Sequence, residues 1–229
     1  MVIIKGIIFD VDETLVYYEG YNSRKWFEKW GKPEIAELGL DLDFETYRKM
    51  VIGELPRSYV EVFGVNHVEF WKAIDEAKLK YRKAAAKEGK IKTFPDVDAL
   101  GELKKFGLKL AAVSNASQEC TEFVLELFDL KKYFDVVFGK DYSYLDGAKP
   151  NPYLIEKALK ALGVQPNEAL VVGDSYSDVL AAHRANVKAV QALRFDNFIG
   201  EADYHVKDLW ELWELVMKKN SKNKLDNTI

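Results

Sequence analysis

The sequence IIKGIIFDVDET at residues 3–14 is the stretch that decides the fold prediction. Residues 3–9 form an almost unbroken apolar run, which is typical of a strand covered on both faces. Two acids, Asp10 and Asp12, follow this run directly. Side chains alternate along an extended chain, so both carboxylates would point to the same side. Because two acids at the end of a buried strand repel each other and lose hydration, the stretch indicates a functional site.

Further apolar, β-branched runs predict that this strand belongs to a parallel sheet. They lie at residues 108–113, 135–138, 169–172 and 187–192. Between the runs, apolar residues recur at helical spacing, as at Leu154, Ala158 and Leu162, where Gly163 should end the helix. Strands that alternate with helices in this way are typical of an α/β fold with a central parallel sheet.

Residues 17–92 interrupt the alternation of strands and helices. They contain helical patterns with aromatic side chains, such as Trp26, Trp30 and Trp71, and no convincing strand. A crossover between neighbouring parallel strands needs only one helix, so this segment is too long for a simple connection. We therefore expect a helical subdomain of residues 17–92 inserted into an α/β core of residues 1–16 and 93–219. A polar, frayed tail should follow at residues 220–229.

The composition excludes several classes of protein. With 229 residues and a net charge of −4, the chain is long enough for a full core and lacks the basic excess of a nucleic-acid-binding protein. Its single cysteine, Cys120, excludes an internal disulfide framework. No apolar run approaches the roughly 20 residues of a membrane-spanning helix, and the N-terminus lacks the pattern of a secretory signal. We expect a cytoplasmic protein without membrane or nucleic-acid partners.

Polar residues follow the ends of several predicted strands. Ser114 and Asn115 follow the run at 108–113, and Gly173, Asp174 and Ser175 follow the run at 169–172. In open parallel sheets, ligands bind in the crevice at the carboxyl ends of the strands. The paired acids after the first strand would suit Mg²⁺, which binds one or two carboxylates together with phosphate oxygens of a substrate. The sequence therefore predicts a phosphate and metal site at one edge of the sheet.

The order of these motifs resembles a known superfamily. The motifs are Asp10-x-Asp12-x-Thr14, Ser114-Asn115, Lys149-Pro150 and Gly173-Asp174-Ser175-x-x-Asp178. Together they resemble the four-motif set of the haloacid dehalogenase (HAD) superfamily, and the helical insertion is similar to the C1-type cap of its phosphoglycolate phosphatase-like members. The resemblance implies the HAD fold, a Rossmann-like three-layer α/β core with a small α-helical cap. It also implies a Mg²⁺-dependent phosphatase that acts on a small phosphorylated metabolite, as a monomer or homodimer.

The resemblance also implies a role for each motif residue. Asp10 would be the nucleophile that forms an aspartyl-phosphate, and Asp12 would be the general acid and base. The residues implied to bind the transferred phosphoryl group are Ser114, Asn115 and Lys149. The groups implied to hold Mg²⁺ are the side chains of Asp10 and Asp174 and the backbone carbonyl of Asp12. The residues implied to support these groups are Thr14, Ser175 and Asp178.

Each motif also has a purely structural interpretation. Ser175 and Asp178 match a capping box, and Ser114, Asn115 or Ser117 would serve as the N-cap of a helix over residues 118–128. Lys149 taken alone is more typical of an exposed surface lysine. Two other Asp-x-Asp pairs, at residues 41–43 and 96–98, precede helical patterns and are interpreted as N-caps.

Several other functions compete with the phosphatase interpretation. A sugar phosphomutase related to β-phosphoglucomutase keeps both acids, whereas haloacid dehalogenases lack an acid at the position of Asp12. A non-catalytic binding protein on the same scaffold should have lost one of the motif residues. His67, His183 and His205 have no metal-binding spacing. In the helical segment, Arg57 is a candidate for binding a second anionic group of the substrate.

Overall fold

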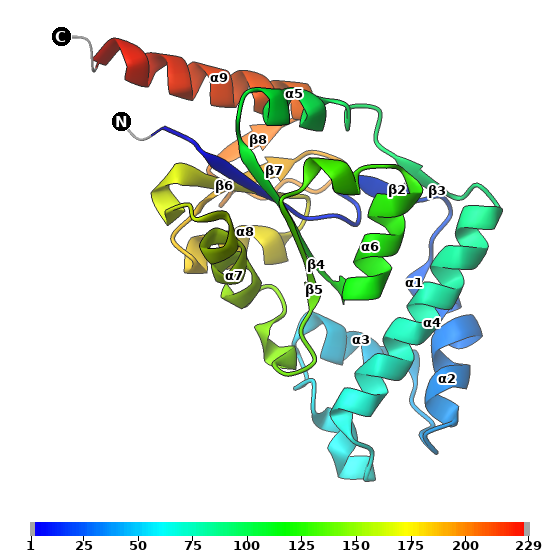
Figure 1. Cartoon of the computed structure of the whole chain (residues 1–229). Coiled ribbons are helices and arrows are strands. Elements are labelled where there is room, and N and C mark those ends of the chain that lie inside the picture. Colours follow the sequence, from blue (N-terminus) through cyan, green and yellow to red (C-terminus); the bar gives the residue numbers. More distant parts are fainter. Residues whose placement is uncertain (1–2, 227–229) are drawn as a thin grey trace. The chain divides into compact units, whose positions relative to one another are not determined.

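The chain folds into two compact units, one of mixed α/β structure and one that is mainly helical. The computed structural model describes the backbone of residues 3–226 and the side chains of residues 3–221 (Figure 1). Within this range the α/β unit consists of residues 3–17, 93–140 and 147–226, and the helical unit consists of residues 18–92 and 141–146. Within residues 3–226, none of the helices has the length and apolar character needed to cross a membrane.

A six-stranded parallel sheet forms the centre of the α/β unit. Its strand order is β5 (Val136–Lys140), β4 (Lys109–Ser117), β1 (Gly6–Phe9), β6 (Ala169–Gly173), β7 (Lys188–Ala192) and β8 (Tyr204–Val206). Neighbouring strands pair in parallel throughout. The predicted α/β fold is therefore confirmed, and the strand that carries the paired acids lies between β4 and β6. Strand β8 was not predicted because it has only three residues, two of them half-buried.

Helices cover both faces of the sheet (Figure 1). They are α5 (Ala99–Lys105), α6 (Gln118–Leu127), α7 (Tyr153–Leu162), α8 (Tyr176–Arg184) and α9 (Leu209–Asp226). On one face, Ile8 and Val171 pack in one apolar cluster with buried residues of α7 and α8. On the other, α5 and α9 pack together, with the rings of Phe106 and Trp213 5.5 Å apart between centroids. Helix α7 ends as predicted at Gly163, which has a φ of 63°.

The expected frayed tail is wrong over residues 220–226. Helix α9 continues to Asp226, and Asn220 is buried. The Asn220 side chain accepts a hydrogen bond from the Ile4 N–H at 2.8 Å and donates one to the Ile4 carbonyl at 2.9 Å. Because these bonds satisfy both backbone groups of Ile4, they hold α9 at Asn220 against the chain at Ile4. Residues 227–229 of the predicted tail lie outside the described residues.

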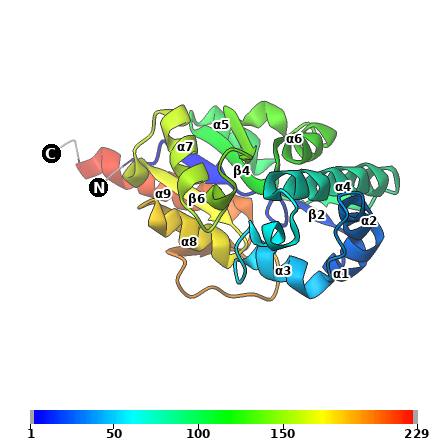
Figure 2. The ribbon, with the colours of Figure 1, turned by 90° about the horizontal axis from the view of Figure 1, so that it is seen from below.

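The helical unit has its own aromatic core. Its longer elements are α1 (Ser23–Trp26), a π-helix (Phe27–Gly31), α2 (Lys32–Ala36), α3 (Phe44–Ile52) and α4 (His67–Lys87). Figures 1 and 2 show α1 and α2 beside α4. Phe27, Tyr47 and Trp71 belong to one buried cluster, in which the rings of Phe27 and Tyr47 stack 4.7 Å apart. Leu145 joins this cluster from the segment 141–146, an addition that no sequence pattern indicated.

The expectation of no strand in residues 17–92 is wrong at both ends of that range. Two short strands, β2 (Val16–Tyr18) and β3 (Ile91–Thr93), pair with each other where the chain passes between the units. Runs of three residues with half-exposed side chains give no clear periodic pattern, so they were missed. The remaining short elements are 3₁₀ helices at Tyr59–Phe63, Lys131–Tyr133, Leu145–Gly147 and Pro166–Glu168.

Of the two predicted Asp-x-Asp helix caps, one forms and the other does not. Asp43 accepts a hydrogen bond from the Thr46 N–H at 2.8 Å and caps α3 as predicted. The pair at residues 96–98 does not cap α5, because Asp98 makes no side-chain capping bond. Asp96 instead binds Arg194 and accepts the N–H of Leu209 at 2.6 Å, at the start of α9. A buried arginine from a distant part of the chain therefore overrides the local capping pattern.

Candidate active site

The parallel register of β1 and β6 brings the two acidic motifs together. Phe9 pairs with Val172, and the Asp10 N–H donates to the Val172 carbonyl at 2.8 Å, so Asp10 lies beside Gly173. A Cβ atom at Gly173 would come within 2.4 Å of the carboxyl carbon of Asp178. The close approach of Asp178 to the strand end therefore requires glycine at this position.

Lys149 lies at the centre of the site. Its Nζ is 2.5 Å from Asp10 Oδ1, 2.6 Å from Asp178 Oδ1 and 3.2 Å from the Val113 carbonyl oxygen. The side chain is only 4% exposed, so the interpretation of Lys149 as a surface lysine is wrong. Burial lowers the pKa of Lys149, but the charges of Asp10 and Asp178 raise it by a larger amount. The pKa of Lys149 therefore lies above its usual value. The ammonium group therefore carries its charge.

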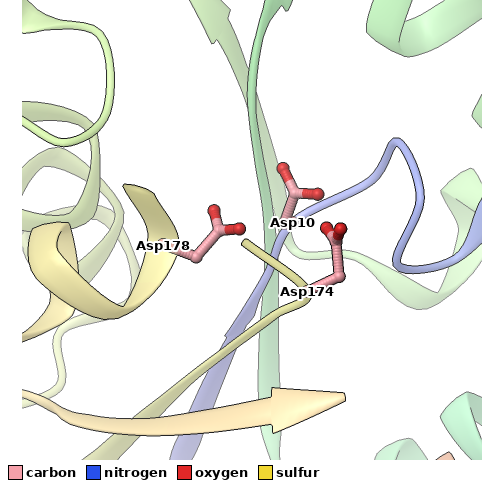
Figure 3. A group of neighbouring side chains, drawn as sticks. All are labelled: Asp10, Asp174 and Asp178. Atoms are coloured by element: carbon pink, nitrogen blue, oxygen red, sulfur yellow. The ribbon is translucent and has the colours of Figure 1, made fainter. Parts of the chain in front are cut away.

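Three carboxylates converge around this lysine. Asp10, Asp174 and Asp178 each offer an oxygen, and these oxygens lie within 4.8 Å of one another (Figure 3). Burial raises the pKa of Asp10 well above its usual value, although Lys149 opposes this shift. Burial and the charge of Asp178 raise the pKa of Asp174 to about 6. One lysine does not balance three acids, and a site of hard oxygen donors with excess negative charge fits a divalent metal ion.

Thr14 connects two of these acids. Its Oγ1 lies 3.2 Å from Asp10 Oδ2 and 3.2 Å from Asp174 Oδ1. The single hydroxyl hydrogen can donate to only one carboxylate at a time, so Thr14 orients the pair without neutralising it. Asp12, the second acid of the motif, is half-buried, and its Oδ2 lies 3.5 Å from Ser114 Oγ. Its side chain is not part of the three-carboxylate group.

Asp178 is both a helix cap and a partner of Lys149, so the structural and the functional interpretations of its motif both apply. One oxygen, Oδ2, accepts the N–H of Ser175 at 3.1 Å and its hydroxyl at 2.5 Å, which completes the capping box of α8. The other oxygen, Oδ1, accepts from Lys149. The helix cap fixes the carboxylate, and the fixed carboxylate positions the ammonium group.

Asn115 positions the backbone of Lys149. Its Nδ2 donates to the Lys149 carbonyl at 2.9 Å, and its Oδ1 accepts the Lys149 N–H at 2.8 Å. Ser114 Oγ accepts the N–H of Ala116 at 3.0 Å. The N-cap of α6 is Ser117, which accepts the Cys120 N–H at 3.2 Å, so Ser114 and Asn115 are not the capping residues.

Arg194 supports the site and was not identified from the sequence. Its side chain is 4% exposed, its Nε donates to the Thr14 carbonyl at 3.0 Å, and its Nη1 donates to Asp96 Oδ2 at 2.8 Å. The guanidinium lies 4.1 Å from the ring centroid of Phe94. Arg194 thus holds the loop that presents Thr14 to the acids. The sequence feature that could have identified Arg194 is its position just after the apolar run 187–192, because polar residues of this fold gather after the strands.

The histidines each have a partner outside this site. His67 contacts Glu61, His183 Nε2 lies 3.0 Å from Asp203 Oδ2, and His205 Nε2 lies 2.8 Å from the Ile199 carbonyl. Within residues 3–226, the group found to have metal-binding geometry is the trio of acids at the strand ends. The three histidines therefore offer no alternative site.

Replacing Asp174 by Asn should stabilise the metal-free protein at alkaline pH and weaken metal binding. The pKa of Asp174 is about 6 in the folded protein against a usual 3.8, so the folded state binds the extra proton. The free energy of unfolding therefore falls as the pH rises from 3.8 to about 6. Asn cannot ionise, so the variant avoids this loss, which is about 3 kcal/mol at most. Urea unfolding at pH 5 and pH 8 in EDTA measures the gain, and calorimetric titration with Mg²⁺ measures the loss of affinity. An unchanged stability at pH 8 would contradict the prediction.

The comparison with known proteins assigns the family. Residues 4–186 match the family model of haloacid dehalogenase-like hydrolases. The chain belongs to this family. The sequence-based resemblance is therefore confirmed, and it covers the α/β unit from β1 to the end of α8 as well as the helical insertion.

Individual relatives are similar over most of the chain. A phosphoglycolate phosphatase of Aquifex aeolicus is 32% identical over 194 residues, which are 82% of this chain and 84% of the relative. A pyrophosphatase PpaX of Bacillus cereus is 36% identical over 201 residues, 81% of each chain. The crystal structure of CbbY from Rhodobacter sphaeroides in complex with phosphate superposes with a TM-score of 0.68 at 24% identity, covering 92% of this chain and 96% of CbbY. That last similarity shows the shared fold.

Proposed function

We propose that this HAD hydrolase is a Mg²⁺-dependent phosphatase that releases phosphate from a small phosphorylated metabolite through an aspartyl-phosphate on Asp10. The observation that carries the proposal is the position of Asp10, buried at a strand end with its Oδ1 2.5 Å from the ammonium group of Lys149. The relatives named as phosphoglycolate phosphatase and pyrophosphatase support a phosphorylated substrate.

The reaction proceeds in two displacements. In the first, a carboxylate oxygen of Asp10 attacks phosphorus, the bond to the leaving oxygen breaks, and Asp12 gives that oxygen a proton. In the second, Asp12 takes a proton from water, the water oxygen attacks phosphorus, and the Asp10–phosphate bond breaks to release phosphate. Asp12 ends in its starting state, so each cycle consumes one water molecule.

The other residues of the site bind and orient the phosphoryl group. Lys149 neutralises negative charge beside Asp10, and Ser114 and the backbone of Asn115 donate hydrogen bonds to phosphoryl oxygens. Asp10, Asp174 and the Asp12 carbonyl would hold Mg²⁺, which supplies positive charge for the phosphoryl oxygens when bound. Thr14, Ser175 and Asp178 keep the acids and Lys149 in place.

The helical unit is proposed to act as a cap that selects the substrate, and Arg57 is its candidate selector. Its guanidinium lies 5.1 Å from the ring centroid of Trp71, and the Trp71 Nε1–H donates to the Arg57 carbonyl at 3.0 Å. Trp71 is buried in the aromatic core, so it holds both the backbone and the side chain of Arg57. A fixed guanidinium suits a carboxylate or a second phosphate.

Replacing Arg57 by Ala should raise KM for an anionic substrate by roughly tenfold, with little change in kcat, since one charge-assisted bond in binding is lost. Steady-state phosphate release measures both constants. Arg48→Ala is the matched control, because Arg48 is an exposed arginine of the same unit that pairs with Glu45. An unchanged KM in Arg57→Ala would contradict the role.

Phosphate release from a panel of phosphorylated metabolites, with Mg²⁺ or with EDTA, tests the proposed function. We expect turnover that requires Mg²⁺, and the ranking of kcat/KM would name the substrate class. A phosphomutase would instead accumulate a bisphosphorylated sugar without releasing phosphate. Absence of both products from folded protein with Mg²⁺ would reject phosphoryl transfer and favour a binding role.

A further inference from the structure

A pocket of about 300 Å³ lies within the helical unit. It contains none of the proposed catalytic residues. Its lining includes four aromatic residues and two lysines: Tyr21, Lys25, Trp26, Lys29, Trp30 and Tyr81. This volume is at the lower end of the range for pockets that enclose small molecules.

One wall of the pocket is a π-helix. After α1, the segment Phe27–Gly31 widens its turn, and the N–H of Lys32 donates to the Phe27 carbonyl, five residues earlier. Hydrogen bonds of this kind are rare in proteins, and π segments are found frequently at functional sites. Here the π segment includes Lys29 and Trp30, which both line the pocket.

Aromatic side chains give the pocket flat apolar surfaces. The ring centroids of Trp30 and Tyr81 are 6.2 Å apart, and those of Tyr21 and Tyr81 are 5.7 Å apart. Tyr21 is 44% exposed, so this aromatic group opens to solvent. Trp26 is buried beside them, and its Nε1 has no hydrogen-bond partner among the described side chains and backbone. A buried indole N–H without an acceptor is uncommon in native proteins.

Two lysines of the pocket form no ion pair with the described residues and can contact a ligand. The acid Glu88 pairs with Lys90, and Glu19 pairs with Lys92. Lys25 and Lys29 line the pocket and form no ion pair within the described part of the chain, although the charge of Lys29 helps to lower the pKa of the pocket residue Glu88. Lys29 Nζ lies 5.4 Å from the ring centroid of Trp30, so positive charge and an aromatic face occur together.

We propose that this pocket binds a small anion that carries a planar aromatic ring. The ring would pack against Trp30 and Tyr81, and the acidic group would accept hydrogen bonds from Lys25 and Lys29. The site is separate from the acids at the strand ends, so it does not depend on the proposed phosphatase activity. Naphthalene-1-sulfonate is a suitable probe because it has both features and no phosphate to hydrolyse.

The indole N–H signals in a ¹⁵N correlation spectrum test the site. The chain has 5 Trp residues, so the same spectrum contains internal references. Titration with naphthalene-1-sulfonate should shift the signals of Trp26 and Trp30 and leave that of Trp213 unchanged. Methanesulfonate, which lacks the ring, and naphthalene-1-methanol, which lacks the charge, should each bind at least roughly tenfold more weakly.

Paired lysine variants separate the pocket from general charge effects. Lys25→Ala with Lys29→Ala should weaken binding of the probe by roughly tenfold or more. Lys131→Ala with Lys132→Ala removes the same charge from the α/β unit and should leave affinity unchanged. Unshifted Trp26 and Trp30 signals at millimolar probe, or equal affinity in the two double variants, would overturn the proposal. The melting temperature of each double variant shows whether the variant is folded when its affinity for the probe is measured.

Discussion

Replacing Asp10 by Asn should reduce phosphate release by roughly 10⁴-fold or more, because the amide has no carboxylate oxygen with which to attack phosphorus. Asn has nearly the same shape as Asp, and its Oδ1 can still accept from Lys149, which lies 2.5 Å from this position. Burial raises the pKa of Asp10 well above its usual value, so removing the charge should not destabilise the fold. The expected variant is therefore folded, able to bind substrate, and inactive.

Phosphate release with Mg²⁺ and the melting temperature together measure this expectation. Asp41→Asn is the matched control, because the Asp41 side chain is 88% exposed and its Oδ1 lies 3.1 Å from Lys32 Nζ at the surface. That variant should keep full activity. If Asp10→Asn retained more than a few per cent of the activity in a preparation free of the parent protein, Asp10 would not be the nucleophile.

Replacing Lys149 by Met should both inactivate and destabilise the protein. Lys149 is the cation between Asp10 and Asp178, and its side chain is 4% exposed. Removing one partner of a buried ion pair leaves uncompensated charge, which costs about 3–5 kcal/mol of unfolding free energy. Loss of positive charge beside the phosphoryl group should lower kcat by roughly 10³-fold. We expect this to be the largest stability change among the site variants.

The stability loss in Lys149→Met should depend on pH. Without the ammonium group, the already raised pKa values of Asp10 and Asp174 rise further in the folded protein, so the folded state binds more protons than the unfolded state. The loss is then fully present above the raised pKa values and shrinks as the pH falls and the acids become neutral. Urea unfolding in EDTA at pH 8 and pH 5.5 measures this difference.

A partly exposed lysine, Lys104, provides the comparison for this prediction. Lys104 pairs with Asp135 at 2.8 Å, and both side chains are at least 30% exposed. Lys104→Met should cost less than about 1 kcal/mol at either pH. If Lys149→Met behaved in the same way as Lys104→Met, Lys149 would not be the cation that balances the buried acids.

The sequence by itself determined the fold class and most of the site. Residues 3–9 and 169–172 are apolar enough to require burial on both faces, which gives a parallel sheet. A parallel sheet places the residues that follow its strands at one edge, so Asp10 and Asp174 had to meet there. These conclusions hold because strand periodicity and the end of each strand are local properties of the chain.

Only the tertiary structure decided how that site is held together. Asp178 caps α8 with one oxygen and binds Lys149 with the other, and Arg194 reaches Thr14 from 180 residues along the chain. Asn220 similarly joins α9 to Ile4. Apart from the local capping bond of Asp178, each of these contacts satisfies a buried polar group with a partner distant in sequence. No local pattern encodes such pairings, because they depend on which elements the folded chain packs together.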